Sequence, residues 1–209
     1  MAAPRAIVDA DVLYRRHARN LLVWHAIAGL FQFHWSRRIL DETRANLLAN
    51  VRLASLDRAA KADQILDRVT ESLDLAIAGS EVRQDDIDAI EPAMTNHPKD
   101  RHVLAAAAAC RADTVVTYNT KDFPRRAAEP HGVVARSPDD FLVSLLEPST
   151  RDVAVAALRQ HAAFHGWSVS RLLDTIGSAG SRGPAIAPRY ARLIARGSGV
   201  AERRPQGAP

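Results

Sequence analysis

The sequence predicts an α/β fold in which helices on both faces cover a small parallel sheet, with a helical appendage after it. Short apolar or β-branched segments alternate with longer segments in which apolar residues recur at helical spacing. This alternation is typical of parallel strands joined by right-handed helical crossovers. Ala, Leu, Val and Ile dominate the apolar residues, and aromatic residues make up 5% of the chain. This composition favours helices packed on a sheet, so we expect a three-layer α/β/α arrangement.

The first strand is predicted at residues 6–8, where apolar residues run directly into Asp9 and Asp11 follows two positions later. An aspartate after a short strand is most often the N-cap of the next helix. In open α/β sheets, however, ligands collect outside the carboxyl ends of the strands. Asp9 could therefore also face a crevice, and acids at other strand ends would favour that interpretation.

The second strand is predicted at residues 31–35, where apolar and polar residues alternate. Ser36 then stands at the N-cap position of a helix over residues 37–50. Glu42 falls in the second turn of this helix and so lies near the strand before it. Further helices are predicted over residues 11–19, 21–31 and 56–78.

A third strand with polar residues at its end is predicted at residues 113–118, which are rich in Thr and Val. It leads into a loop with Asn119 and Asp122. Asp100 belongs to the first turn of the helix before it, over residues 101–112, where an acid also suits the helix dipole. The segment over residues 81–90 is short and acidic. A last strand is predicted at residues 132–135. A helix from residue 138 to about 146 has Ser137 as its N-cap.

The chain divides into a main domain over residues 1–147, a helical appendage over 148–177 and a basic tail over 178–209. The tail holds six arginines and one glutamate, which gives a charge of +5 against a total of +4, so the rest of the chain is close to neutral. A tail rich in Gly, Pro, Ser and Arg is most often disordered, although it could also contact nucleic acid through phosphates. Appendage helices are predicted over 151–164 and 168–176, and a short tail helix near 190–195.

Composition excludes several classes of protein. No run of about 18 apolar residues is present, so we expect no membrane span. No basic region followed by a long apolar stretch marks a secretory signal at the N-terminus. The single cysteine, Cys110, cannot form an internal disulfide. We therefore expect a cytoplasmic protein.

Polar residues from distant parts of the chain are predicted to converge at one edge of the sheet. In a parallel sheet the ends of strands 6–8 and 113–118 lie at the same edge, which brings Asp9 towards Asn119 and Asp122. Asp100 begins the helix that precedes the strand at 113–118, and Glu42 lies on the helix that follows the strand at 31–35. Each residue could instead be a cap or a surface charge, but carboxylates that do converge repel one another unless a cation lies between them. Carboxylate ligands suit Mg²⁺ or Mn²⁺, and no His/Cys cluster that would suit zinc accompanies them.

At this point the sequence resembles the PIN domain, the ribonuclease fold of the VapC-type toxins of bacterial toxin–antitoxin pairs. The resemblance covers about residues 5–147 and depends on the order and spacing of several motifs, since no one of them is specific. The matching segments are residues 7–13, residues 36–43 with Ser36 and Glu42, residues 100–107, residues 116–124 and residues 137–142.

The resemblance implies that Asp9, Glu42 and Asp100 hold a divalent metal, Mg²⁺ or Mn²⁺. One departure concerns Asn119, because many PIN toxins have an aspartate at this place. The subgroup with asparagine has an acid three residues later, which is Asp122, and we include Asp122 among the metal-binding and catalytic residues. Supporting residues are Asn119, Thr117, Ser36 and Asp11, and basic candidates for RNA phosphates are Arg15, Arg16, Arg37, Arg38, Lys121 and Arg125.

The leading hypothesis is a metal-dependent ribonuclease that hydrolyses RNA phosphodiesters and acts as a toxin. Its partners would be RNA and a small antitoxin whose segment covers the acidic crevice. A non-catalytic PIN-like module that binds RNA or protein, and a PIN nuclease of RNA processing that has no antitoxin, are the alternatives. A homodimer is compatible with the apolar helices predicted at residues 21–31 and 56–78.

Overall fold

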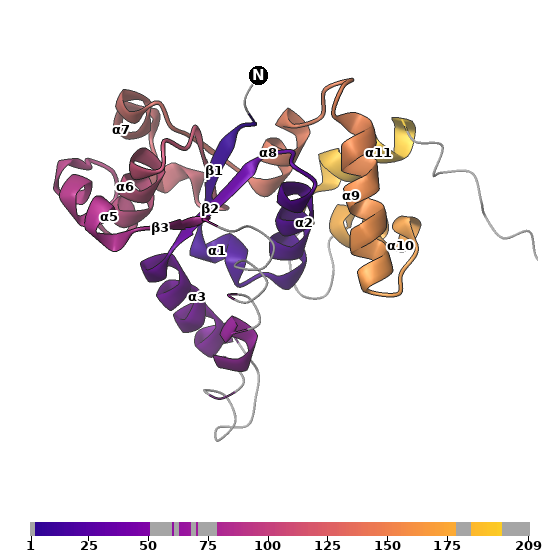
Figure 1. Cartoon of the computed structure of the whole chain (residues 1–209), viewed down its shortest axis with the longest axis horizontal. Helices are drawn as coiled ribbons and strands as arrows, with labels where there is room; N and C mark the ends of the chain where they lie inside the picture. The colour runs from indigo at the N-terminus through magenta and orange to yellow at the C-terminus, as the bar shows by residue number, and fades with distance from the viewer. Residues whose placement is uncertain are drawn as a thin grey trace, which may run out of the picture.

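The computed structural model describes residues 3–50, 60, 63–67, 70, 79–178 and 185–197. These residues contain a five-stranded sheet with the order β3-β2-β1-β4-β5, in which every neighbouring pair of strands is parallel (Figure 1). The strands are β1 (Arg5–Val8), β2 (Gln32–Ser36), β3 (Glu81–Val82), β4 (Thr114–Val116) and β5 (Val134–Arg136). The parallel sheet predicted from the sequence is therefore confirmed.

Helices cover both faces of the sheet, so the three-layer prediction is confirmed as well. Figure 1 shows α5 and α6 on one side of the sheet, α2 and α8 on the other, and α9 beyond α2. The helices are α1 (Ala10–Leu13), α2 (Arg16–Ile27), α3 (Arg37–Asn50), α5 (Gln84–Ile90), α6 (Arg101–Ala109), α7 (Arg125–Ala128), α8 (Pro138–Ser144), α9 (Arg151–Phe164), α10 (Val169–Gly177) and α11 (Pro188–Gly197). None of the helices within the described ranges is long and apolar enough to cross a membrane.

Local capping explains where several helices begin. The Oδ1 atom of Asp9 accepts a hydrogen bond of 2.7 Å from the backbone N–H of Ala10, at the start of α1. Ser36 Oγ accepts from the N–H of Ile39 at 3.3 Å, so the predicted cap of the 37–50 helix is confirmed. Ser137 likewise caps α8, where its Oγ accepts from the N–H of Asp140 at 3.1 Å. Side-chain oxygens satisfy N–H groups that have no partner inside the helix.

Some element boundaries differ from the prediction. The helix expected over residues 11–19 is interrupted at Tyr14 and Arg15, so that α1 is a single turn and α2 begins at Arg16. The helix expected to reach residue 112 ends at Ala109, because Arg111 takes a left-handed backbone conformation with φ of 55°. Strand β3 was not predicted. Of the helix expected over residues 56–78, residues 60, 63–67 and 70 are helical, and the rest lies outside the described residues.

The C-terminal segment contains the short helix predicted near residues 190–195, which extends over Pro188–Gly197 as α11. The disorder predicted for the rest of the tail falls mostly outside the described residues. The side chains of Tyr190 and Ile194 in α11 are fully buried, in the same apolar core as the sheet. The apolar residues of this stretch recur at helical spacing between arginines, so one face of α11 packs on α8 and α10 while the arginines remain outside.

The appendage also packs against the main domain. Helix α9 lies against α2, and α10 lies against α9 and α11 (Figure 1). The Asp139 carboxylate at the start of α8 accepts hydrogen bonds from the backbone N–H groups of Arg189 and Tyr190, at 2.9–3.2 Å. An acid at a helix N-terminus is favourable for the helix dipole. Asp139 thus anchors α11 to the last helix of the main domain.

Candidate active site

Two aspartates after β1 and a threonine after β4 form the centre of the candidate site. The Oγ1 atom of Thr117 lies 2.8 Å from Oδ2 of Asp9 and 3.2 Å from Oδ2 of Asp11. The backbone N–H of Tyr118 donates a 2.9 Å hydrogen bond to the same Asp11 oxygen. Because β1 and β4 are parallel neighbours, their carboxyl ends bring these residues together across more than 100 positions of sequence.

Both aspartates are held away from water. Asp9 is 5% exposed, and its burial together with the neighbouring Asp11 raises its pKa to about 7. Burial also raises the pKa of Asp11 to about 6, against hydrogen bonds from Tyr118 and Thr117 that lower it. The second carboxylate oxygen of Asp11, Oδ1, is buried without a hydrogen-bond partner among the described residues. Two buried carboxylates with a free oxygen are an environment that a cation would stabilise.

Asp100 lies at the N-terminus of α6, in the single turn Pro98–Asp100 that precedes the helix. Its carboxylate accepts a 3.2 Å hydrogen bond from Nδ1 of His97. Burial raises the pKa of Asp100, and the charges of Asp122 and Glu42 raise it further. Asp100 in turn contributes to the raised pKa of Asp9. The four predicted acids therefore share one electrostatic neighbourhood.

Glu42 is joined to a residue that the sequence did not indicate. The fully buried imidazole of His102 lies with Nε2 2.9 Å from Oε1 of Glu42. His102 follows Asp100 by two positions, in the first turn of α6, so it connects the Asp100 helix to α3. A histidine at the start of an otherwise alanine-rich helix is the only signal in the sequence, and it is equally typical of a buried core residue.

The remaining predicted residues divide into two groups. Asn119 and Asp122 leave β4 as expected: the N–H of Asn119 donates to Thr117 Oγ1 at 3.0 Å, and Asp122 ends the turn Thr120–Asp122. Ser36 is fully buried and its hydroxyl serves as the cap of α3. No hydrogen bond between Ser36 and the acids is found within the described residues.

The chemistry of these residues fits a hard divalent cation, since carboxylate oxygens, an amide and water are what Mg²⁺ and Mn²⁺ prefer. The buried free oxygen of Asp11 and the raised pKa values of Asp9, Asp11 and Asp100 are consistent with this chemistry. The described side chains do not, however, converge as three or more His, Cys, Asp or Glu ligands around one point. The ligand set predicted from the sequence therefore remains a prediction.

Several of the basic residues predicted to contact RNA phosphates form ion pairs with acidic residues. Arg38 contacts Glu91 at 2.8 Å, Arg125 contacts Glu129 at 2.5 Å, and a longer contact of 3.9 Å joins Arg37 to Asp41. These ion pairs reduce the charge that the arginines can offer to a phosphate. Arg15 differs from them in its surroundings, which are described below.

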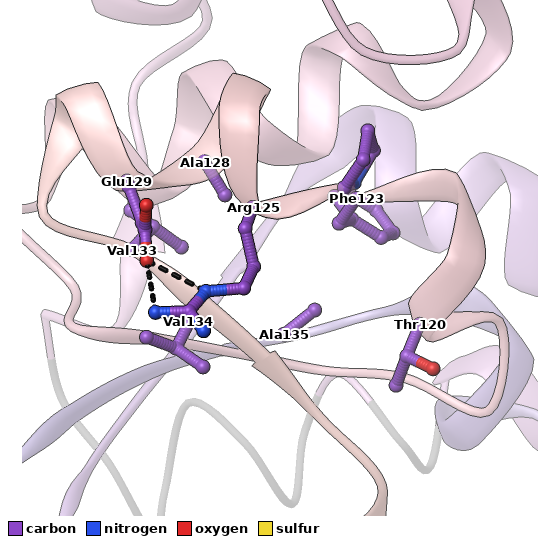
Figure 2. Close-up of a pocket in the computed structure, with 9 residues that line it drawn as sticks. Thr120, Phe123, Arg125, Ala128, Glu129, Val133, Val134 and Ala135 are labelled. Carbon is purple, nitrogen blue, oxygen red and sulfur yellow. Dashed lines mark hydrogen bonds and ion pairs between the residues drawn. The ribbon is translucent and has the colours of Figure 1, made fainter.

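A cavity of about 210 Å³ lies beside the edge strand β5 (Figure 2). Arg125 extends across it to Glu129, above an apolar wall that includes Val134 and Ala135. Thr120 and Phe123 line its other end. None of the predicted acids lines this cavity, so the cavity is not the candidate active site.

Comparison with known proteins gives an independent result. The family model described as PIN domain matches residues 5–121 of the chain. A protein of Mycobacterium tuberculosis named "Putative ribonuclease VapC50" is 39% identical over 109 residues, which are 51% of this chain and 62% of that protein. The chain thus matches less than two thirds of this relative's length. No solved structure matches significantly.

Proposed function

The chain belongs to the PIN-domain family, and from this premise we propose that it is a divalent-metal-dependent ribonuclease that acts as the toxin of a toxin–antitoxin pair. The observation that carries the proposal is the pair of buried aspartates, Asp9 and Asp11, that meet one hydroxyl at the end of β4. Their place at the carboxyl edge of a parallel sheet is where ligands of such folds bind. The name of the mycobacterial relative supports the same activity.

In this proposal Asp9, Asp100, Glu42 and Asp122 hold Mg²⁺ or Mn²⁺. When bound, such an ion lowers the pKa of a coordinated water and stabilises the charge that develops on a phosphate oxygen. Thr117 fixes the carboxylates of Asp9 and Asp11 by donating or sharing its hydroxyl hydrogen, and its Oγ1 also accepts the N–H of Asn119. Asn119 orients a water or a phosphate oxygen without adding charge.

Two further roles belong to the chain's own residues. Buried Asp9 and Asp11 exclude bulk water from one side of the site, which strengthens every charge interaction there. His102 holds one oxygen of Glu42 and leaves the other for a ligand or for a water that loses its proton. RNA is the proposed substrate, because the mycobacterial relative is named "Putative ribonuclease VapC50".

The proposed protein partner is a small antitoxin that covers the acidic edge. A segment with an arginine would neutralise the carboxylates of Asp9 and Asp100, which repel each other in its absence. Such a contact would exclude metal and RNA together. This role is tested by expressing the chain in bacteria, where we expect growth to stop. Co-expression of an adjacent gene for a short DNA-binding protein should then restore growth.

The activity is tested by incubating total cellular RNA with the purified protein and Mg²⁺, Mn²⁺ or EDTA. We expect cleavage that requires metal and is lost in Asp9→Asn and Asp100→Asn. Asp88→Asn is the matched control, because Asp88 is exposed on α5 and hydrogen-bonds only to Gln84 among the described residues. RNA binding without cleavage under any metal would instead indicate a non-catalytic module.

A further inference from the structure

Arg15 occupies an unusual position beside the candidate active site. Its guanidinium carbon lies 4.7 Å from the ring centre of Tyr118 and 5.2 Å from that of Tyr14. Tyr118 directly follows Thr117, which joins the two buried aspartates. The break between α1 and α2, where Arg15 precedes the first residue of α2, is therefore what brings its side chain to the end of β4.

Within the described part of the chain, Arg15 has no carboxylate within ion-pair distance. Its Nε atom is buried and has no hydrogen-bond partner there. Neighbouring arginines differ: Arg38 and Arg125 form ion pairs, and the Nη1 atom of Arg19 donates to the carbonyl of Leu13 at 2.6 Å. The charge of Arg15 lowers the pKa of Asp11, but no direct ion pair joins the two side chains among the described residues. A partly buried cation without a direct ion pair is stabilised by an anion from outside that supplies one.

Stacking on aromatic rings determines how this cation can bind. Two rings beside a guanidinium restrict its plane and cover its faces, which leaves the N–H groups at its edge for hydrogen bonds. The edge of a guanidinium matches two oxygens of a phosphate. The acids at this sheet edge would repel an RNA strand, so a fixed positive group close to them is needed for the strand to approach.

We propose that Arg15, stacked on Tyr14 and Tyr118, binds a backbone phosphate of the RNA next to the one that is cleaved. This proposal rests on the proposed function, since it takes RNA as the substrate. Arg15 would then position the strand relative to Asp9 and Asp11 and would not take part in the bond-breaking step. Binding through a phosphate predicts little dependence on the base sequence.

Arg159 offers a matched control away from the candidate site. It has the same side chain, it is exposed on α9, and the described residues show no ring contact or ion pair for it. Arg15→Gln and Arg159→Gln therefore remove the same charge from two different places of the molecule.

The test measures the affinity of the full chain for a labelled single-stranded RNA by fluorescence anisotropy in EDTA, where no metal-dependent cleavage takes place. We expect Arg15→Gln to weaken binding by about tenfold and to reduce the slope of log K against log salt by about one. Arg159→Gln should change the affinity less than about twofold. Arg15→Lys should keep the slope but bind more weakly than the wild type, because an ammonium does not stack as a planar fork.

Unchanged affinity of Arg15→Gln, or equal losses in Arg15→Gln and Arg159→Gln, would overturn the proposal. If Arg15→Gln fails to fold, Tyr118→Leu removes the ring and keeps the charge; weaker binding with an unchanged salt slope supports the proposal, and unchanged binding overturns it. The results of this binding experiment can be distinguished from a failure of the proposed nuclease activity. A wild type that binds RNA through Arg15 but never cleaves it refutes the nuclease alone.

Discussion

The Nε2 atom of His102 lies 2.9 Å from Oε1 of Glu42, so a fully buried imidazole links the first turn of α6 to the second turn of α3. We assign the proton to Nε2, because its partner is a carboxylate that can only accept when ionised. The other nitrogen, Nδ1, is buried without a partner among the described residues. His102 therefore fixes the direction of Glu42 and touches neither substrate nor reacting atoms in this arrangement.

The first prediction concerns this pair. His102→Leu keeps the volume but removes the donor, so Glu42 should turn into solvent and the affinity for Mn²⁺ should fall by about 10- to 100-fold, the usual effect of losing a group that orients a metal ligand. His102→Gln keeps an N–H near the Nε2 position and should restore most of the affinity. Isothermal titration of Mn²⁺ into the metal-free protein measures both.

A buried histidine far from the acids provides the comparison. His161→Leu removes an imidazole from α9 and should leave the Mn²⁺ affinity within about twofold of the wild type, since no residue of the proposed metal site loses a hydrogen-bond partner. If His102→Leu and His102→Gln bind Mn²⁺ equally, the hydrogen bond to Glu42 has no role in the metal site.

The second prediction concerns the two buried aspartates. At pH 8 both are charged and close to each other, so Asp9→Asn should make the metal-free protein more stable than the wild type by about 1–3 kcal/mol. Added Mg²⁺ should raise the melting temperature of the wild type and not that of Asp9→Asn. Thermal unfolding with and without Mg²⁺ is the measurement; a less stable Asp9→Asn would mean that the charges are already compensated.

The third prediction concerns helix α11. Tyr190 is fully buried, and its ring meets that of His25 edge-on with 5.3 Å between the centres. Tyr190→Ala should lower the free energy of unfolding by about 3–5 kcal/mol, as for other buried aromatic residues. Leu193→Ala, at a position of the same helix that is 36% exposed, should lower it by less than about 1 kcal/mol. Urea unfolding compares them, and equal effects would show that α11 is not part of the core.

The fourth prediction concerns acid. Burial lowers the pKa of His161 to about 3 and that of His25 to about 4, below the ordinary 6.5. At these two histidines the unfolded chain therefore takes up protons below pH 6.5 that the folded chain does not, so their burial lowers stability as the pH falls from about 6.5 towards 4. The raised pKa values of Asp9 and Asp11 act in the opposite direction, so the contribution of the histidines is measured by comparing variants. At pH 5 the expected loss is about 2 kcal/mol for each histidine.

Urea unfolding at pH 7.5 and pH 5 measures this loss. His161→Phe should remove about half of it, because a phenyl ring in contact with Trp24 does not titrate. His131→Gln, which replaces a half-exposed histidine between α7 and β5, should behave as the wild type. An equal change in stability between pH 7.5 and pH 5 for the wild type and His161→Phe would contradict the prediction.

The parts of the fold that the sequence predicted are those with local causes. Ser36 and Ser137 are N-caps that stand where the spacing of apolar residues changes to that of a helix, and Asp9 follows an apolar strand. Strand β3 has two residues, one of them exposed, which is too short for a periodic pattern. In α11 arginines stand at every third or fourth position, so the sequence pattern did not indicate an apolar face. That face is evident from the contacts of α11 with α8 and α10.

The candidate site shows the same division. The approach of Asp9 to the end of β4 was predictable, because a parallel sheet aligns the ends of its strands, whereas Asp11 and Thr117 were implied only by the resemblance to the PIN domain. The role of His102 depends on Glu42, which is 60 positions away, and no local pattern records such a contact. The stacking of Arg15 on Tyr118 depends on the interruption between α1 and α2. The periodicity of the sequence predicted the boundary between these helices several residues later.

The contact between His25 and Tyr190 spans 165 positions of sequence, and it sets an order of events during synthesis. Helix α2 leaves the ribosome early, but its apolar face can be covered only after α9 and residue 190 have been translated. Contacts this distant form late and slowly, and the uncovered face is prone to aggregation meanwhile. A nascent chain of this protein should therefore depend on chaperones more than a PIN domain without these helices, and α2 should gain its full resistance to proteolysis only after residue 190 has been translated.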